Sequence, residues 1–379
     1  ISNYGSPKMD KFFRRVLLCV LALLALSYII YMNIESENHK TVFIPILSNY
    51  SNPIDFSQKR FDKFIFALDS GGCAGLGNQL FRIAALYGIG LYPNVNRTPG
   101  LSGRKNCLEK HVKEFSEIMP NVVKLVEFED LSDDNFATTT FGRRMYENPE
   151  VIHDVPDKYL VINHGYLHGI RYFSHVMDEI RQLFDFHPKL KAEVEEYGTQ
   201  LFIFDQSSHK MCVHIRRNDF LKHRLLETRT EFLIPAMKTV KDFLSEKYPG
   251  KQISLIFFTD DEKYVDSLEF PKDNYLNVYR PTLSSRGAVM YFGIRYCDSL
   301  LQSASGSSFA SWIGFLMPEG KDFFYHRRVF KNIKEDMGKD YVDYERHPKH
   351  WNILELDESQ KTVFIDNRWN FERYNKPNL

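Results

Sequence analysis

The sequence predicts an α/β fold built on open parallel sheets, and three observations support this prediction. Short apolar runs recur along the chain, at residues 64–68 (FIFAL), 211–215 (MCVHI) and 253–258 (ISLIFF). Polar or glycine-rich loops follow these runs and helical patterns lie between them, an alternation that is typical of a parallel sheet. The composition, 43% hydrophobic and 15% aromatic, suits a large core.

The first α/β unit begins at the run 64–68. A glycine-rich segment at 70–77 (SGGCAGLG), called the glycine loop here, follows it. The next apolar residues have the spacing of one helix face: Leu80, Ile83, Ala84 and Tyr87. Strand, glycine loop and helix in this order indicate one unit of an open parallel sheet. Residues 100–200 carry no comparable pattern.

The second half of the chain shows the pattern more clearly. After the strand at 211–215, a predicted helix has these apolar residues on one side: Phe232, Leu233, Ala236, Met237, Val240 and Leu244. Further predicted elements are a strand at 253–258, a helix at 288–296, a strand at 299–302 and a helix opened by the serine-rich segment 303–308, called the serine turn here. This last helix has an apolar face of Phe309, Trp312, Ile313 and Leu316. In such sheets ligands bind at the carboxyl ends of the strands.

The N-terminal region predicts a membrane anchor. Residues 16–32 (VLLCVLALLALSYIIYM) carry no charge, which is the short end of a membrane-spanning helix. Lysines and arginines precede this run and glutamates follow it, so the positive-inside rule makes 1–15 a cytosolic tail and the rest luminal. A cleaved signal peptide is the alternative, but the run is long and its end offers no small-residue cleavage site. The polar residues 33–60 are predicted to form a luminal stem.

Luminal exposure gives meaning to two further features. Asn49 (Asn-Tyr-Ser) and Asn96 (Asn-Arg-Thr) begin glycosylation sequons. The cysteines outside the anchor are Cys73, Cys107, Cys212 and Cys297. They permit two disulfides with three possible pairings, or four buried thiols, and their spacing does not match a zinc site.

The charge balance excludes one class of partner. Lysine and arginine total 49, as do aspartate and glutamate, and no long basic run follows the anchor. Nucleic acid is therefore not an expected partner.

The strongest chemical signal is the segment 214–219 (HIRRND), called the arginine block here, which emerges from a predicted strand. Adjacent arginines at a strand end are costly to bury unless an anion pairs with them. A guanidinium binds phosphate oxygens through a planar fork. Asp219 is expected either to fix an arginine or to accept a proton. For an isolated Arg-Arg-x-Asp, a surface cluster of ion pairs is the alternative.

Three other segments have both a functional and a structural interpretation. The glycine loop precedes Asn78 and Gln79 at a predicted helix start, where free N–H groups can meet an anion or Asn78 can act as N-cap. The serine turn can contact phosphate or cap its helix. Asp260 and Asp261 can hold a metal, contact a nucleoside or begin a helix.

The order of these segments carries a resemblance. Gly-Leu-Gly-Asn-Gln at 75–79, the HxRRxD pattern of the arginine block and the serine turn before Phe-Ala-Ser-Trp resemble the α1,2-fucosyltransferase family, glycosyltransferase family 11. The resemblance runs from about residue 68 to 316. HxRRxD also occurs in α1,6- and protein O-fucosyltransferases. This chain departs from many relatives at Asn218, where they have glycine, and the Asp260-Asp261 position varies across the superfamily, so linkage and acceptor stay open.

The resemblance implies a GT-B-like enzyme with two facing Rossmann-type domains. Residues 61–205 would form the acceptor side and 206–379 the GDP-fucose side. The implied reaction is inverting transfer of fucose from GDP-fucose to a terminal sugar hydroxyl of a glycoprotein or glycolipid glycan, O-2 of galactose in this family. No metal or other cofactor is implied. The implied location is the Golgi membrane, with one span and a luminal catalytic domain.

The resemblance also implies roles for particular residues. The residues implied to bind the diphosphate are Arg216 and Arg217. His214 is implied to orient the loop that carries them. Those for binding the donor are Gly77, Asn78, Gln79, Asp260, Asp261, Ser307 and Ser308. The candidates for the base that takes the acceptor proton are Asp219, His223 and Glu227. The alternatives are an α1,6- or protein O-fucosyltransferase, or a glycan-binding pseudoenzyme, which should have lost an arginine or a loop glycine.

Overall fold

A computed structural model describes residues 53–69, 73–131, 136–142, 146–163, 167–336, 343–357, 359 and 361–373. They lie in a compact unit that begins at Asn52. The predicted anchor at 16–32 and the sequon at Asn49 lie outside these residues. Within the described ranges, no helix combines the length and apolar character needed to cross a bilayer.

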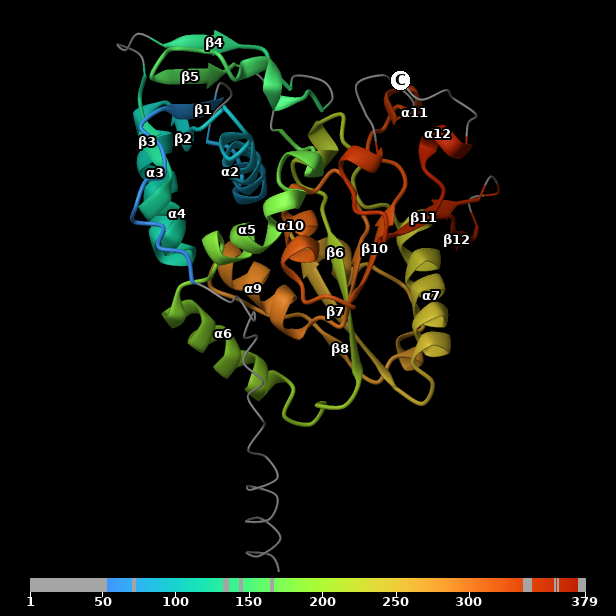
Figure 1. Ribbon diagram of the computed structural model, residues 1–379. Coiled ribbons are helices and arrows are strands. Elements are labelled where there is room, and N and C mark those ends of the chain that lie inside the picture. Colours follow the sequence, from blue (N-terminus) through green and yellow to red (C-terminus); the bar gives the residue numbers. More distant parts are fainter. Residues whose placement is uncertain are drawn as a thin grey trace, which may run out of the picture. The chain divides into compact units, whose positions relative to one another are not determined.

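The first sheet has five strands in the order β3-β2-β1-β5-β4, and every neighbouring pair is parallel. Its strands are β1 (Phe64–Asp69), β2 (Thr98–Gly103), β3 (Glu127–Glu129), β4 (Ala137–Thr139) and β5 (Tyr159–Ile162). Figure 1 shows β1 and β2 beside the helix that follows the glycine loop. The strand order reverses at β1, because β2 lies on one side of it and β5 on the other.

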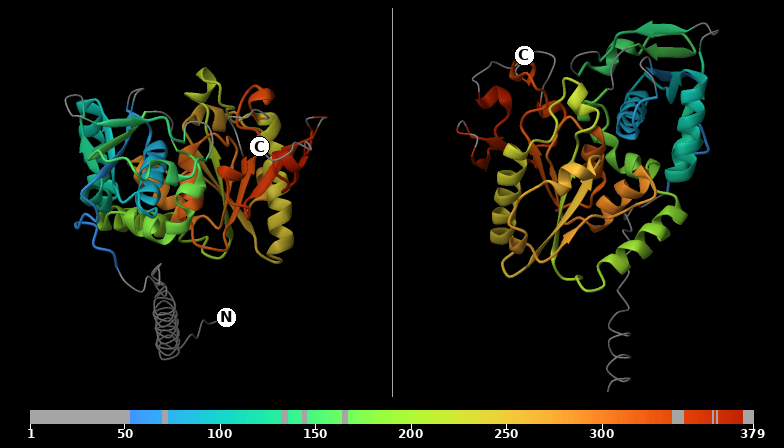
Figure 2. Two further views of the ribbon diagram at one scale, coloured as in Figure 1. Left: turned by 45° about the horizontal axis from the view of Figure 1, so that its top comes forward. Right: turned by 180° about the vertical axis from the view of Figure 1, so that it is seen from behind.

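The second sheet has seven strands in the order β12-β11-β10-β9-β6-β7-β8, all parallel except β12, which pairs antiparallel with β11. Its strands are β6 (His209–Ile215), β7 (Ile253–Thr259), β8 (Val278–Tyr279), β9 (Ser299–Gln302), β10 (Asp322–His326), β11 (Asn352–Leu356) and β12 (Val363–Ile365). Here the order reverses between β6 and β9, which are direct neighbours. The rear view in Figure 2 shows the same strands from behind.

The described helices connect these strands. The α-helices are α2 (Leu76–Gly90), α3 (Lys105–Ile118), α4 (Pro120–Leu125), α5 (Met177–Leu183), α6 (Pro188–Leu201), α7 (Thr230–Lys247), α8 (Glu262–Asp266), α9 (Arg286–Tyr296), α10 (Ser308–Leu316), α11 (Ile333–Asp336) and α12 (Asn370–Arg373). Short 3-10 turns are η1 (Pro149–Ile152), η2 (Ile170–Tyr172), η3 (Ser174–Val176), η4 (Phe220–Lys222), η5 (Lys272–Asn274) and η6 (Asp343–Glu345).

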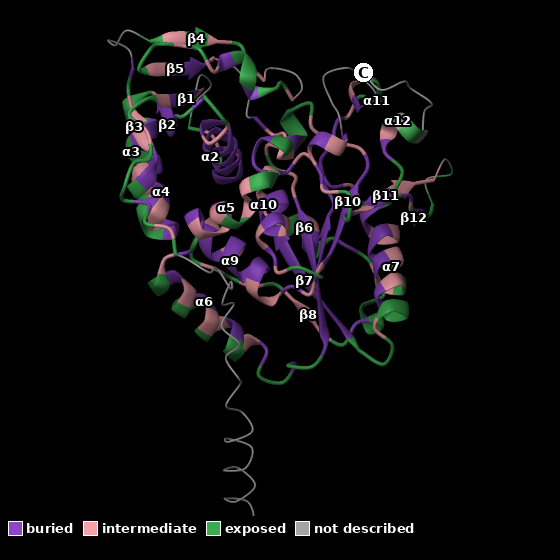
Figure 3. Ribbon diagram, in the orientation of Figure 1, coloured by how far each residue is buried: buried purple, intermediate pink, exposed green. Residues whose placement is uncertain are grey.

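The central strands of the second sheet are buried on both faces, as their purple colour in Figure 3 shows. Met211 and Val213 of β6 pack in the core cluster that includes α7, whereas Cys212 between them packs with α9 and α10. Successive strand residues point to opposite faces, so a sheet covered on both sides needs a continuous apolar run. This explains the runs that identified the strands in the sequence.

The two sheets share one core cluster. It joins Ile65 of β1 to Phe323 of β10, with Trp312 of α10 fully buried within it. Phe56, which falls in the predicted stem, is 3% exposed and belongs to the same cluster. The packed part of the chain therefore begins before residue 61.

Disulfides resolve the pairing that the sequence left open. Cys73 bonds to Cys107, and Cys212 bonds to Cys297. The first joins the glycine loop to the start of α3. The second joins β6 to the residue that follows α9.

The α/β prediction is confirmed, with two parallel sheets that lie on either side of residues 205–206 in the sequence. The predicted strands and helices of the second half are present within two residues of their expected bounds, except α10, which begins at the last residue of the serine turn. The helix after the glycine loop begins at Leu76, so its N-cap is Gly75 and Asn78 lies inside its first turn.

Candidate active site

The carboxyl ends of β6 and β9 define the candidate site. The strand order reverses between these neighbours, and a ligand crevice in an open parallel sheet forms at such a reversal, outside the carboxyl ends of the strands. The arginine block continues from β6, and the serine turn directly follows β9. The backbone N–H of Ser303 donates to the carbonyl of His214 at 3.3 Å, which holds the two segments together.

Arg216 is the first residue after β6. Its Nε lies 2.8 Å from Asp219 Oδ1 and 3.4 Å from Asp260 Oδ2, and its guanidinium is 5.6 Å from the Phe220 ring centroid. Within the described residues its two terminal nitrogens donate no hydrogen bond, and 35% of the side chain is exposed. Arg216 therefore keeps the edge of its guanidinium that can bind an oxyanion.

Arg217 is held much more completely. Its Nε donates to Asp261 Oδ2 at 3.2 Å, and its Nη1 donates to the carbonyl of Thr228 at 2.6 Å. Its guanidinium also lies 4.0 Å from the centroid of the Tyr264 ring. Two of its three nitrogens are thus committed to the protein, which makes Arg216 the better candidate for a bidentate contact with a diphosphate.

The two aspartates after β7 hold the arginine block. Asp260 accepts a hydrogen bond from the backbone N–H of Arg217 at 2.9 Å and lies beside Arg216. Asp261 is the N-cap of α8, with one oxygen on that helix and the other on Arg217. Both carboxylates face the arginines in the structure, and the contact with the nucleoside that the resemblance implies stays a prediction.

The first turns of α2 and α10 meet beside the serine turn. Ser308 Oγ donates to Asn78 Oδ1 at 2.7 Å. A Cβ on Gly77 would lie 2.5 Å from the backbone nitrogen of Phe309, so only glycine permits this approach. The motif residues Gly77, Asn78 and Ser308 are therefore brought together, although the sequence separates Asn78 from Ser308 by 230 residues.

Both helices begin without a side-chain cap. Neither Gly75 of α2 nor Ser307 of α10 caps its helix, and neither first turn contains an acidic residue. Uncapped first-turn N–H groups and the positive helix end favour an anion. Ser307 is 4% exposed, and its carbonyl accepts from the amide of Gln302 at 2.9 Å. Ser307 thus contributes backbone to the turn, and Ser308 contributes the hydroxyl that contacts Asn78.

Gln79 does not lie with its motif neighbours. It is 1% exposed and its Nε2 is 2.8 Å from Nε2 of His111 on α3. Its Oε1 accepts from Arg82 at 3.3 Å. Because α2 begins earlier than expected, Gln79 lies on the buried side of the helix, and its amide is engaged in the interior.

His214 is the second-last residue of β6 and is buried, with 6% exposure. Burial, reinforced by the charge of Arg216, lowers the pKa of its imidazole to about 3. Its ring lies 6.1 Å from that of Phe309, and its carbonyl accepts bonds from Ser303. A neutral ring of such low basicity suits a role in orienting the arginine block.

The three candidate bases have different surroundings. Asp219 is half-exposed beside Arg216, and His223 is exposed. Glu227 is nearly buried, with Oε1 2.9 Å from Arg229 Nε and Oε2 3.3 Å from Lys331 Nζ. Burial alone would raise the pKa of Glu227, but its hydrogen bonds and the two cations lower it overall. Arg229 and Lys331 therefore favour the ionised form of Glu227.

Sequence reasoning missed Thr228 and Lys331. Lys331 Nζ donates to the carbonyls of Phe220 and Leu221 at 2.8 and 3.0 Å, so it fastens the segment that follows the arginine block. A lone lysine more than a hundred residues downstream has no sequence signal for this contact.

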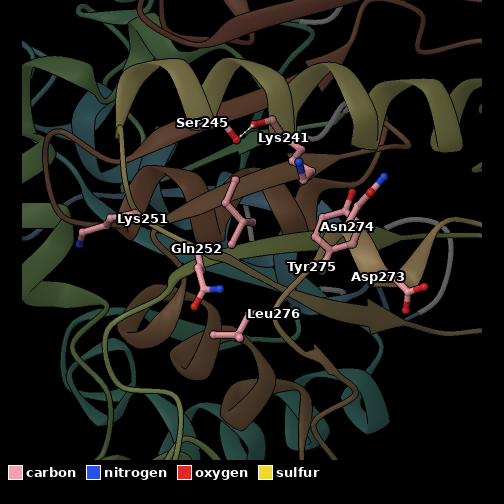
Figure 4. Close-up of a pocket in the computed structure, with 9 residues that line it drawn as sticks. Lys241, Ser245, Lys251, Gln252, Asp273, Asn274, Tyr275 and Leu276 are labelled. Carbon is pink, nitrogen blue, oxygen red and sulfur yellow. Dashed lines mark hydrogen bonds between the residues drawn. The ribbon is translucent and has the colours of Figure 1, made fainter.

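A separate pocket of about 380 Å³ lies at the opposite, amino end of the second sheet. Figure 4 shows Lys241 and Ser245 of α7 above Gln252 and Tyr275. No residue of the arginine block or the serine turn lines it. In the parts of the chain that the structure describes, no cluster of three or more His, Cys, Asp or Glu side chains could hold a metal ion.

No family model matches the chain. Two relatives from Caenorhabditis elegans, both named galactoside 2-alpha-L-fucosyltransferase, match most of it. One is 26% identical over 306 residues, which cover 76% of this chain and 79% of the relative. The other is 24% identical over 326 residues, which cover 79% and 78%.

Solved structures with some likeness are more distant. Fucosyltransferase NodZ from Bradyrhizobium has 13% identity and a TM-score of 0.47, over 80% of this chain and 98% of NodZ. POFUT1 in complex with GDP-fucose has 12% identity and a TM-score of 0.37, over 72% and 99%. Because these TM-scores are low, neither structure serves as support for the fold. The fold described above rests on the strand pairings of this chain.

The sequence relatives, together with an α/β fold whose polar motifs meet at a strand reversal, define the class: the chain is a glycosyltransferase. Within this class, the chain is similar to proteins named galactoside 2-alpha-L-fucosyltransferase, at 24 to 26% identity over about three quarters of its length. The family that the ordered motifs indicated is thereby confirmed.

Proposed function

We propose that this chain transfers fucose from GDP-fucose to O-2 of a terminal galactose on a glycan, with inversion at the anomeric carbon. The names of its relatives support the sugar and the linkage. The observation that carries the proposal is Arg216, whose terminal nitrogens make no hydrogen bond within the described residues although it lies at the strand reversal.

In the proposed mechanism, breaking the bond between fucose and phosphate leaves a GDP anion. Arg216 would bind its diphosphate through the free edge of the guanidinium, and the uncapped N-terminus of α10 would add backbone donors. Arg217, fixed by Asp261 and Tyr264, would hold the arginine block in place. We propose a GT-B-like arrangement, with the donor on the second sheet and the acceptor on the side of the first.

Inversion needs a group that accepts the proton of the attacking hydroxyl. Asp219 is the candidate that the surroundings favour, because Glu227 is held by two cations. Loss of transfer in Asp219→Asn, with Glu227→Gln retaining more activity, would support this assignment. The reverse ranking would move the base to Glu227.

We propose that transfer needs no metal. The charge of the leaving GDP must be balanced by some cation, and the two candidates are Arg216 and a metal held by Asp260 and Asp261. Both aspartates already bind the arginine block, which supports the arginine.

The test is incubation of the full chain, purified in detergent, with GDP-fucose and a glycan array, with and without EDTA. Fucose on terminal galactose, at a rate that EDTA leaves largely unchanged, is the expected result. Transfer to a core N-acetylglucosamine would favour the α1,6 alternative, and transfer to protein hydroxyls the O-fucosyl alternative. Binding of glycan without turnover would identify a pseudoenzyme. If EDTA abolished the transfer activity and manganese restored it, a metal rather than Arg216 would balance the charge of the leaving GDP.

We also propose a single-pass anchor at 16–32 in the Golgi membrane, with the catalytic part in the lumen. Two disulfides support an oxidising compartment, and the exposed Asn96 is accessible to a glycan. Endoglycosidase should increase the mobility of the membrane-bound product, and Asn49→Gln and Asn96→Gln should each remove the part of this mobility change that a glycan at that asparagine causes. An unchanged mobility in the wild type would contradict luminal topology.

A further inference from the structure

Two hydroxyl groups meet behind the arginine block. Thr228 Oγ1 and Ser303 Oγ lie 2.8 Å apart, and both residues are essentially inaccessible, with 0% and 1% exposure. Thr228 comes from the segment between β6 and α7, and Ser303 is the first residue of the serine turn. Buried hydroxyls need hydrogen-bond partners, and neighbouring protein groups supply them here.

The directions of the bonds follow from the number of protons. Ser303 Oγ donates to the carbonyl of His214 at 2.7 Å, and this uses its only hydroxyl proton. In the shared contact Ser303 must therefore accept, which makes Thr228 the donor. Thr228 Oγ1 in turn accepts from the backbone N–H of Arg216 at 3.0 Å. The chain of bonds thus runs in one direction from Arg216 through Thr228 and Ser303 to His214.

This chain of bonds fixes the end of β6. It starts at the N–H and ends at the carbonyl of the two residues that flank Ile215, the last residue of the strand. The backbone of Thr228 adds two more contacts: its N–H donates to the carbonyl of Arg216 at 2.9 Å, and its carbonyl accepts from Arg217 Nη1 at 2.6 Å. A single buried residue therefore holds the backbone of one arginine and the side chain of the other.

We propose that Thr228 is a positioning residue for Arg216, acting through its hydroxyl and Ser303. The inference rests on the proposed fucosyl transfer, because it assigns Arg216 to the leaving diphosphate. Valine has the shape of threonine without the hydroxyl, so Thr228→Val would leave the N–H of Arg216 without an acceptor in a dry interior. The arginine block would then shift, and a displacement of about 1 Å can cost about a hundredfold in rate.

The experiment compares three variants of the full chain. Thr228→Val should lower kcat by about a hundredfold with a smaller change in the KM for GDP-fucose. Thr228→Ser, which keeps the hydroxyl, should recover most of the rate. Thr239→Val is the matched control. Thr239 Oγ1 also donates a hydrogen bond, in its case to the carbonyl of Val363 at 2.6 Å, but Thr239 lies on α7 away from the site. This variant should leave kcat unchanged.

A double variant separates positioning from a general loss of structure. If Thr228 acts through Arg216, then Thr228→Val combined with Arg216→Lys should be no slower than Arg216→Lys alone. If the rate losses of the two single variants multiplied in the double variant, the inference would be overturned. A fully active Thr228→Val would overturn it as well. If Thr228→Val does not fold, Ser303→Ala interrupts the same chain of bonds and should show the same non-additivity.

The failure of the inference is distinct from that of the proposed function. Calorimetry with GDP gives the second readout. A wild type that binds GDP and transfers fucose, together with a fully active Thr228→Val, overturns only the positioning role. A wild type that neither binds GDP nor transfers fucose overturns the proposed function, and the positioning role with it.

Discussion

The charged side chains at the two ends of the second sheet differ in how completely the protein pairs them. At the amino end, Lys210 of β6 is 5% exposed, and its ammonium donates to Asp205 and Ser208. Asp205 in turn accepts bonds from Ser254, Asn277 and Tyr279. Every charged group in this cluster has its partners within the protein.

At the carboxyl end of the same strand, the charged side chains are less completely hydrogen-bonded. Arg217 is held by Asp261 and Thr228, but Arg216 beside it donates no hydrogen bond from its two terminal nitrogens within the described residues. The difference teaches how to distinguish a structural charge cluster from a binding site. Of these two clusters, both rich in charge, the one at the carboxyl end is the one with guanidinium nitrogens that donate no hydrogen bond to a described residue.

The largest expected effect is on catalysis by Arg216. Arg216→Lys keeps the charge but loses the planar fork, so transfer should fall about 100- to 1000-fold, as when an oxyanion donor is lost. The melting temperature should stay near that of the wild type, because few contacts are lost. Initial rates and thermal unfolding check both statements.

Arg217→Lys and Arg280→Lys sharpen this test. Arg217→Lys should lose both rate and stability, because its guanidinium is bound on two sides. Arg280 forms an ion pair with Asp266 at the surface, and its replacement should change neither. Equal stability losses for Arg216→Lys and Arg217→Lys would remove the distinction between them.

The next effect is on stability at the amino end. Lys210→Met removes one partner of a buried ion pair and leaves Asp205 uncompensated, which typically costs about 3 to 5 kcal/mol. Urea unfolding should show this loss, whereas the transfer rate per folded molecule should not change. A variant that stays stable but loses activity would contradict the division between the two ends.

The smallest expected effect concerns pH. His326 ends β10 and stacks on Phe232, with ring centroids 3.8 Å apart, and burial with nearby arginines lowers its pKa from 6.5 to about 3. The folded state therefore keeps this ring neutral. Below pH 6.5 the unfolded chain binds a proton that the folded chain does not, so stability falls by about 1.4 kcal/mol per pH unit until the pH approaches 3.

His326→Phe removes this titration and keeps an aromatic ring. Between pH 7 and pH 5, the free energy of unfolding should therefore fall by up to about 2 kcal/mol less in the variant than in the wild type. Asp336, whose pKa burial raises to about 6, changes stability in the opposite direction but is present in both proteins. Parallel pH profiles would show that His326 is protonated in the fold.

The sequence predicted those parts of the fold whose periodicity is strong. The helix α7 buries the same six residues that its pattern indicated. Strand β2 escaped detection because it reads TPGLSG, with a proline and two glycines, and β3 and β4 have only three residues each. Their identity as strands comes from pairing with distant segments, which no local pattern records.

The site was predictable as far as local motifs reach. The arginine block and the serine turn lie at the strand ends where the sequence placed them. The inward position of Gln79 depends on where α2 begins, and the roles of Thr228 and Lys331 depend on contacts with residues far along the chain. Such contacts follow from the arrangement of the strands, which the motifs do not specify.

The close contact at Gly77 has a consequence for the order of synthesis. Asn78 meets a partner that is 230 residues further along the chain. At about 5 to 20 residues per second, Ser308 is added roughly 12 to 46 seconds after Asn78. During that interval the start of α2 has no second helix to pack against, and its glycine surface is open. The candidate site is therefore among the last parts of the molecule to be assembled, and the proposed transfer activity would report that both halves of a newly made chain have folded.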